Sequence, residues 1–276
     1  MMASETKFVR VVRLMVFVIA AVVTTSAIAG PVYDGLVGHW KFDGDYSDTS
    51  LTGNAALAVP GTGTVAFATG QVGQALSVSA AAYARTVNNL AVSGQMPRTV
   101  NAWFHPTAAQ TQAPLAAGTG ANGRIFDLYL RTSPTEFGGH FYGGNYDTLT
   151  GANPQYTPGA WTMATLVYDG DQTVDVYRNG EFFKSTTLPG TLNTGLSALY
   201  FGGGGGYSVT RQYDGMIDDV AVWNRVLTAD EIAAVYQTNS GGASLGQTSP
   251  LAVQFDMGNS GAASGPIGPA QWLGAM

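Results

Sequence analysis

The sequence predicts an all-β fold, an antiparallel β-sandwich with one short helix near its end. Short apolar runs recur along the 276 residues, and Gly, Asn, Asp and Pro separate them. Glycine is abundant, with 37 residues, which is typical of a protein with many tight turns. One all-β domain of roughly 200–250 residues is a normal unit, so the chain is long enough for one large sandwich.

The predicted strands differ in how their apolar side chains are arranged. Residues 99–105 and 125–130 alternate between two faces, with Asp127 opposite the apolar face of the second run. Residues 161–168 are apolar on both faces, which is typical of a central strand. The predicted strands are 37–42, 75–78, 83–87, 99–105, 125–130, 161–168, 173–178, 181–187, 198–201 and 213–223.

The strongest local signal is the pair Asn179-Gly180 between two of these strands. Both central positions of a type I′ turn need positive φ, which Asn and Gly tolerate best. Residues 173–178 and 181–187 are therefore predicted to form a tight hairpin. The turn Asp169-Gly170 connects the preceding strand to it, which gives a three-stranded meander.

A short helix is predicted at residues 227–236, where the period of the apolar residues changes. Thr228 is a natural N-cap, and Glu231 three residues later completes a capping box. Ile232, Val235 and Tyr236 share one face, which can dock on the edge of the sandwich. Glu231 is therefore assigned a structural role and no chemistry.

The first 29 residues have the pattern of a secretory signal peptide. Three basic residues precede an apolar stretch at 14–23, and small residues occupy the −3 and −1 positions of a cut after Ala29. An uncleaved membrane anchor is the alternative, but the stretch is shorter than the about 20 residues that span a bilayer. We expect a secreted protein, extracellular or at the cell surface, with no membrane span after cleavage.

The other end of the chain changes composition. The sandwich domain is predicted over residues 30–238, and a Gly/Ser-rich linker starts at residue 239. Residues 239–276 are either a tail or the truncated start of a further domain. The second interpretation is favoured slightly, because Leu251, Phe255 and Trp272 are unusual in a solvated tail.

Charge limits the partners. Loss of residues 1–29 removes three of the 12 basic and one of the 18 acidic residues, which leaves 9 basic, 17 acidic and a net charge of −8. Nucleic acid needs a basic surface, so it is excluded. Calcium, a neutral glycan and an extracellular protein remain compatible. There is no cysteine, so the chain has no disulfide, thiolate metal site or cysteine nucleophile.

Six motifs in order resemble the laminin-G-like branch of the concanavalin A-like lectin/glucanase superfamily. The resemblance extends from about Gly35 to Tyr236 and implies a two-sheet jelly roll. One position departs from the family, because Met163 stands where His is usual. The motifs are residues 35–43 (GLVGHWKFD), 70–76 (GQVGQAL), 99–104 (TVNAWF), 161–170 (WTMATLVYDG), 176–180 (VYRNG) and 215–227 (GMIDDVAVWNRVL).

Catalysis is not expected. The laminarinase-like glycosidases of that superfamily use a Glu-x-Asp-x-x-Glu strand. This chain has no such strand, and its glutamates are Glu5, Glu136, Glu181 and Glu231. Its Gly-x-Ser-x-Gly pattern, residues 242–246 (GASLG), follows the predicted helix inside the Gly/Ser-rich linker, and so it lacks the strand-to-helix context of a nucleophile elbow. The three histidines lie far apart, and the glycine run 202–206 lacks the Lys-Ser/Thr of a phosphate loop.

A structural calcium ion is one candidate ligand. The resemblance implies that such an ion can link the N-terminal strand to the last strand. Calcium prefers several oxygen ligands, and Asp43, Asp45 and Asp218 are the candidate residues. The alternative is that Asp218 accepts hydrogen bonds from backbone N–H groups in a turn.

A glycan is the other candidate ligand. Residues 137–147 combine aromatic and planar polar side chains in a Gly-rich segment, where function tends to lie. The candidate residues are Tyr142, Asn145, Tyr146, Asp147 and Arg211. The alternative is that these aromatic rings are core or cross-strand pairs.

The predicted function is that of a non-catalytic exported binding module, for carbohydrate or for cell-surface adhesion. A structural module of a larger secreted multidomain protein is the alternative. A glycoside hydrolase with unrecognised acids is a weaker one. The sequence does not specify the sugar, the partner or the oligomeric state.

Overall fold

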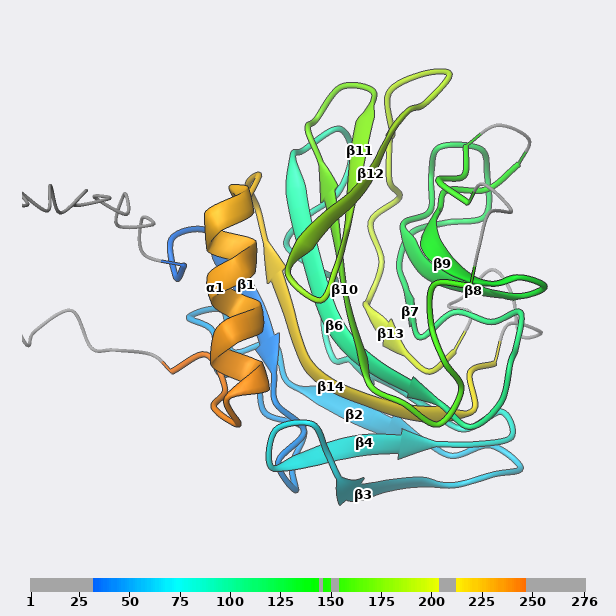
Figure 1. Cartoon of the computed structure of the whole chain (residues 1–276), viewed down its shortest axis with the longest axis vertical. Helices are drawn as coiled ribbons and strands as arrows, with labels where there is room; N and C mark the ends of the chain where they lie inside the picture. Colours follow the sequence, from blue (N-terminus) through cyan, green and yellow to red (C-terminus); the bar gives the residue numbers. More distant parts are fainter. Residues whose placement is uncertain (1–31, 144–145, 150–153, 204–211, 247–276) are drawn as a thin grey trace, which may run out of the picture.

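The computed structural model describes residues 32–143, 146–149, 154–203 and 212–246. These residues form two antiparallel sheets packed face to face, with one helix near the C-terminal end (Figure 1). The predicted antiparallel sandwich with a C-terminal helix is therefore confirmed. The predicted signal peptide and nearly all of the predicted tail lie outside the described residues. Within the described ranges, no helix is long and apolar enough to cross a membrane.

The larger sheet contains the predicted meander at one edge. The described part of this sheet has eight strands, and β1 pairs with β14 beside β4. The pairings β6-β10-β11-β12 confirm that residues 162–168 form a central strand. Across the sheet the strands are β12 (Glu181–Thr187), β11 (Thr173–Arg178), β10 (Thr162–Tyr168), β6 (Arg98–Pro106), β14 (Gly215–Trp223), β4 (Gln74–Val78), β3 (Val65–Thr69) and, on β14, β1 (Leu36–Trp40).

The smaller sheet is made of short strands from distant parts of the chain. Six of its strands lie in the described ranges. In order they are β2 (Ala56–Val59), β5 (Tyr83–Thr86), β13 (Tyr200–Phe201), β7 (Leu115–Ala116), β8 (Asp127–Thr132) and β9 (Thr135–His140).

The main core lies between the sheets. Val100, Ala102 and Phe104 of β6 are buried in it, so the two-residue alternation predicted for this strand is confirmed. Trp40 is fully buried, and its ring lies 5.2 Å from that of Phe201 on the opposite sheet. Large aromatic side chains therefore join the two sheets across the sandwich.

Helix α1 (Ala229–Ser240) covers the outer face of the larger sheet. Figure 1 shows it beside β1 and β14, on the side away from β7, β8 and β9. Tyr236 stacks on Trp103 with ring centroids 5.7 Å apart, and Ile232 and Val235 are buried in the same cluster. The expected position at the sandwich edge was wrong, because the outward side chains of the central strands, such as Met163, are apolar and need a cover.

A bulge divides β14. Residues 215–217 pair with β4, whereas residues 220–223 pair with β1 on the same side. The register against β6 shifts between Asp218 and Ala221, and Asp219 adopts φ 42°. The two adjacent aspartates thus lie where the neighbour of β14 changes.

Four described strands were not predicted, namely β2, β3, β7 and β9. The error has a clear cause in β9, because residues 137–140 were taken as part of a Gly-rich loop. Gly139 pairs with Leu128 of β8, and a Cβ at Gly139 would collide with the Phe141 ring. The glycine therefore allows close packing inside a strand rather than a turn.

Candidate functional site

Two of the three candidate calcium ligands meet at the turn between β3 and β4. Asp218 Oδ2 accepts a hydrogen bond from Val72 N at 2.9 Å, and its Oδ1 accepts one from Asp219 N at 2.8 Å. Asp43 Oδ1 accepts from Gln74 N at 2.7 Å. Both carboxylates therefore hold the same turn through its backbone N–H groups.

The third candidate, Asp45, lies in its own turn, where Oδ1 accepts from Ser47 N at 2.8 Å. Burial raises the pKa of Asp218 to about 8, although the N–H of Val72 acts in the opposite direction. In the part of the chain that the structure describes, no group of three or more His, Cys, Asp or Glu side chains is arranged to hold a metal. Calcium binding by Asp43, Asp45 and Asp218 stays a prediction.

The two tyrosines proposed to bind a glycan follow β9, and they differ in exposure. Tyr142 is 40% exposed and has φ 73°, a conformation that is uncommon for a bulky residue. Tyr146 is partly buried and packs against the main core. Asn145 and Arg211 lie outside the described residues.

Asp147 is held in a polar cluster. His140 Nδ1 lies 2.6 Å from Asp147 Oδ1, and an Arg131 guanidinium nitrogen lies 3.3 Å from Oδ2. The Tyr129 ring stacks on the His140 ring at 4.8 Å. Nε2 of His140 is shielded from solvent and has no hydrogen-bond partner within the described ranges. We call His140, Asp147, Arg131 and Tyr142 the β9 corner.

Sequence reasoning found Tyr142 and Asp147 but missed the other two members of the β9 corner. Arg131 on β8 pairs with Glu136, whereas His140 at the end of β9 pairs with Asp127, so it is the long Arg131 side chain that reaches Asp147 near His140. The isolated bridge between His140 and Asp147 then returns the chain beside β9. The signal that could have found them is the polar-apolar alternation of residues 127–132, continued into a second strand.

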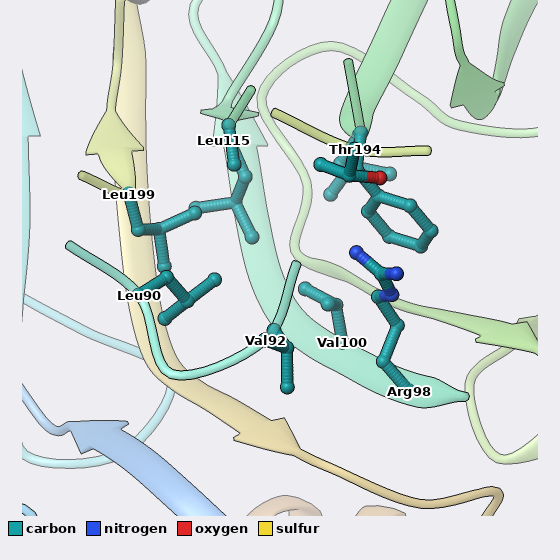
Figure 2. A pocket seen from close by; sticks show the side chains of 10 residues that line it. Leu90, Val92, Arg98, Val100, Leu115, Thr194 and Leu199 are labelled. Atoms are coloured by element: carbon teal, nitrogen blue, oxygen red, sulfur yellow. The ribbon is translucent and has the colours of Figure 1, made fainter. Parts of the chain in front are cut away.

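A small apolar cavity inside the sandwich is not a ligand site. Its volume is about 10 Å³, the space of about one water molecule. Figure 2 shows the Arg98 side chain extending toward Thr194 among the apolar residues that line it. The Arg98 guanidinium donates to the carbonyl oxygens of Met96 at 2.9 Å and Gly94 at 2.7 Å, and it lies over the Phe126 ring. Arg98 therefore anchors a loop, and burial lowers its pKa to about 10.

The described glutamates have structural positions. Glu136 is fully buried, lies 3.5 Å from Lys184 Nζ and accepts a hydrogen bond from Gln155. Glu231 accepts from the backbone of the residue that caps α1. Glu181 is exposed at the start of β12. Glu136 and Glu231 therefore have partners that belong to the fold.

A family model matches residues 77–233 of the chain, and its description is the concanavalin A-like lectin/glucanases superfamily (Laminin_G_3). The chain belongs to this superfamily. The resemblance predicted from the six motifs is therefore confirmed, and so is the jelly-roll fold that it implied. No protein with a curated description matches the chain in sequence.

Solved structures of the same fold include binding domains. Domain 4 of AbnA, an extracellular GH43 arabinanase from Geobacillus stearothermophilus, was solved with arabinotriose. It is 22% identical, and the match covers 73% of this chain and 98% of that one with a TM-score of 0.59. The binding domain of botulinum neurotoxin DC, solved with SialylT, is 11% identical with a TM-score of 0.54, at 75% and 52% coverage.

The binding domain of Paraclostridial Mosquitocidal Protein 1 is similar at 15% identity and a TM-score of 0.54, with 74% of this chain and 52% of that chain covered. The superfamily domain thus spans about half the length of the two toxin chains. At these identities the likeness shows the fold alone.

Proposed function

We propose that this superfamily member is a non-catalytic exported module that binds carbohydrate at the β9 corner. The observations that support the site are the polar cluster of Asp147, His140 and Arg131 and the exposure of Tyr142, which follows His140 by two residues in the chain. The exported character rests on the signal pattern of residues 1–29, which lie outside the described structure.

The chemistry of the corner suits a sugar. A tyrosine ring packs on the apolar face of a pyranose or furanose, and a few fixed polar groups select its hydroxyls. Arg131 supplies donors and Asp147 supplies acceptors, each held by the contact between them. A sugar hydroxyl would also give His140 Nε2 the partner that it lacks among the described residues.

The chemistry does not suit hydrolysis. Glycosidases place two carboxyl groups on either side of the scissile bond. Asp147 is engaged by both His140 and Arg131, and Asp127, which pairs with His140 across β8 and β9, is fully buried. This favours binding without cleavage.

The relatives support the same class of function. Domain 4 of the arabinanase was solved with arabinotriose, and a toxin binding domain was solved with SialylT. The match covers 98% of the arabinanase domain but 52% of the toxin chain, so the arabinanase domain is the stronger support for oligosaccharide binding by this fold. We extend that role, and not the particular sugar, to this chain.

A glycan array followed by titration tests the proposal. We expect binding to at least one oligosaccharide, with arabinotriose and sialylated glycans included. Tyr142→Ala and Asp147→Asn should each weaken it about tenfold or more, which is about 1.4 kcal/mol. Phe182→Ala is the control, because Phe182 is a 57% exposed aromatic residue on β12.

Two results would count against the proposal. Unchanged affinity in Tyr142→Ala and Asp147→Asn would remove the β9 corner as the site. Absence of any bound glycan on the array would overturn carbohydrate binding as the function.

A further inference from the structure

We infer that a second carbohydrate site, for an uncharged linear oligosaccharide, lies at the end of the sandwich where β6 ends and β10 and β14 begin. Two hollows open there. The Trp161 hollow has a volume of about 340 Å³ and the Gln112 hollow about 310 Å³. Each is within the size range of small-molecule sites.

The Trp161 hollow combines an aromatic residue with a free guanidinium. Trp161 is partly exposed, and the ring of His105 lies 5.2 Å from its own. The Arg178 guanidinium lies over the Phe183 ring at 5.1 Å, which orders it. No hydrogen bond or ion pair of that guanidinium occurs with any described residue, so its donors remain available. Asn179 is fixed, because its Oδ1 accepts from the backbone N–H of β10 at 2.9 Å.

The Gln112 hollow is lined by carboxamides on a rigid base. Gln110 is held at both ends, since Nε2 donates to Asp214 O at 2.7 Å and Oε1 accepts from Asp214 N at 2.9 Å. Gln112 Oε1 is shielded from solvent and lacks a hydrogen-bond partner in the described structure. Gln212 and Thr107 complete the polar wall. A buried acceptor without a partner costs stability unless a ligand supplies the hydrogen bond.

Tyr156 connects the two hollows. It lines the Trp161 hollow, and its hydroxyl lies 3.5 Å from the carbonyl oxygen of Gln110, which lines the other. The hydroxyl also donates to Arg131 O at 3.0 Å, so it is fixed between them. The hollows are therefore neighbours, and one extended ligand can occupy both.

The residues around both hollows select the ligand class. Their polar side chains are mainly carboxamides, which carry no net charge, namely Gln110, Gln112, Gln155, Gln212 and Asn179. Among the described residues that line them, Asp214 is the single carboxylate and Arg178 the single cation. This balance favours an uncharged chain, and one carboxylate does not make the pair that hydrolysis needs.

This site lies at the opposite end of β9 from His140, although Tyr156 also contacts the backbone of Arg131. Gln155 N donates to Thr135 O at the first residue of β9, whereas His140 is the last residue of that strand. Five residue steps at about 3.3 Å each separate these ends by roughly 17 Å. The inference rests on carbohydrate binding as the function, but it assigns a different place to the ligand.

Calorimetric titration of the full chain with cellohexaose, xylohexaose, laminarihexaose and mannohexaose, and with the matching disaccharides, tests the inference. We expect at least one hexasaccharide to bind at least tenfold more tightly than its disaccharide. Trp161→Ala and Gln112→Ala should each weaken that binding at least fivefold, while Trp161→Phe retains most of it. Gln74→Ala is the matched control, because Gln74 is an exposed glutamine on β4.

Each outcome decides the inference separately from the proposed function. If Tyr142→Ala abolished hexasaccharide binding while Trp161→Ala and Gln112→Ala left it unchanged, the second site would be overturned and the proposed function would remain intact. No binding of any of the four hexasaccharides would also overturn it, whereas the glycan array still tests the β9 corner. A melting temperature equal to that of the wild type shows that a variant is folded.

Discussion

The carboxyl group of Asp218 accepts hydrogen bonds from the backbone of a turn, and its burial there disfavours the charged form. It is fully buried at the bulge of β14, and its two oxygens accept from the N–H groups of Val72 and Asp219. Burial raises its pKa from 3.8 to about 8. Asp219 is equally enclosed and takes a different partner, because its Oδ1 lies 3.1 Å from His39 Nε2.

The raised pKa predicts that stability falls as the pH rises. The folded state binds the Asp218 proton more tightly than the unfolded chain does, so this contribution is complete below pH 4 and is lost as the pH approaches 8. We expect the melting temperature to decrease over that interval, with each kcal/mol lost lowering it by roughly 2–4 °C. Asp218→Asn should flatten the slope, while the exposed control Asp45→Asn should retain it. An equal slope in Asp218→Asn and the wild type would contradict the prediction.

The sequence suggested that Asp43 and Asp218 approach each other, and they do share the β3–β4 turn. It did not suggest His39 or Asp219 as a buried pair. His39 lies on β1 and Asp219 in the bulge, 180 residues apart. The alternation of side chains between two faces holds only for a regular strand. It cannot predict which way Asp219 points, because this residue adopts φ 42° in a bulge.

The helix α1 depends on its first turn. Glu231 N donates to Thr228 Oγ1 at 3.2 Å, and Thr228 N donates to Glu231 Oε2 at 2.8 Å. Arg225 adds a bidentate ion pair to the same glutamate, at 2.7 and 2.9 Å. The pKa of Glu231 is lowered, first by this arginine.

Removal of the cap should loosen the helix. Thr228→Ala is expected to lower the free energy of unfolding by about 1 kcal/mol, the usual cost of a lost N-cap. Thr228→Ser keeps the hydroxyl and should restore most of it. Chemical denaturation measures both, and a Thr228→Ala variant as stable as the wild type would show that the sheet alone holds α1 in place.

Elements with a strong local signal could be predicted, and those without one could not. The Asn179-Gly180 hairpin and the capping box occur as expected, since a few adjacent residues specify each. The strands β2 and β3 are short and partly exposed, and β7 has two residues. These strands form because they pair with segments far away in the sequence, and a local sequence pattern cannot predict such pairing.

The candidate site was predictable in part for the same reason. Tyr142 and Asp147 lie close in sequence and were chosen from composition. Arg131 and Tyr156 come from other segments and reach their sites only through the packing of β8 and β9. Most residues of the Trp161 hollow lie in the segment 154–162, but Arg178 and Asn179 join it only through the pairing of β10 with β11, which no local pattern predicts.

The closing segment after α1 ties the ends of the domain together. Leu245 is buried in the outer cluster with Leu36 of β1, and Ser244 donates a hydrogen bond to Asp219. Trp223 Nε1 donates to Val32 O at 2.6 Å, so the start of the domain lies against the same cluster. The packed structure thus continues past residue 240.

Leu245→Ala should therefore weaken the whole domain. A buried leucine replaced by alanine costs about 2–5 kcal/mol where the cavity cannot collapse, and we expect the lower end because this cluster lies beneath a single helix. Leu51→Ala is the control, since Leu51 is 92% exposed. Thermal unfolding measures both, and equal melting temperatures would show that residues 241–246 do not stabilise the sandwich.

The pairing of β1 with β14 also determines when in folding the first described strand can join the sheet. His39 finds its partner Ala221 only after most of the domain has been synthesised, because 182 positions separate them. Such distant contacts form slowly, and partly synthesised chains keep apolar strand edges uncovered. The first described strand must therefore wait for the last one, and the larger sheet is complete only once the chain as far as Trp223 is available.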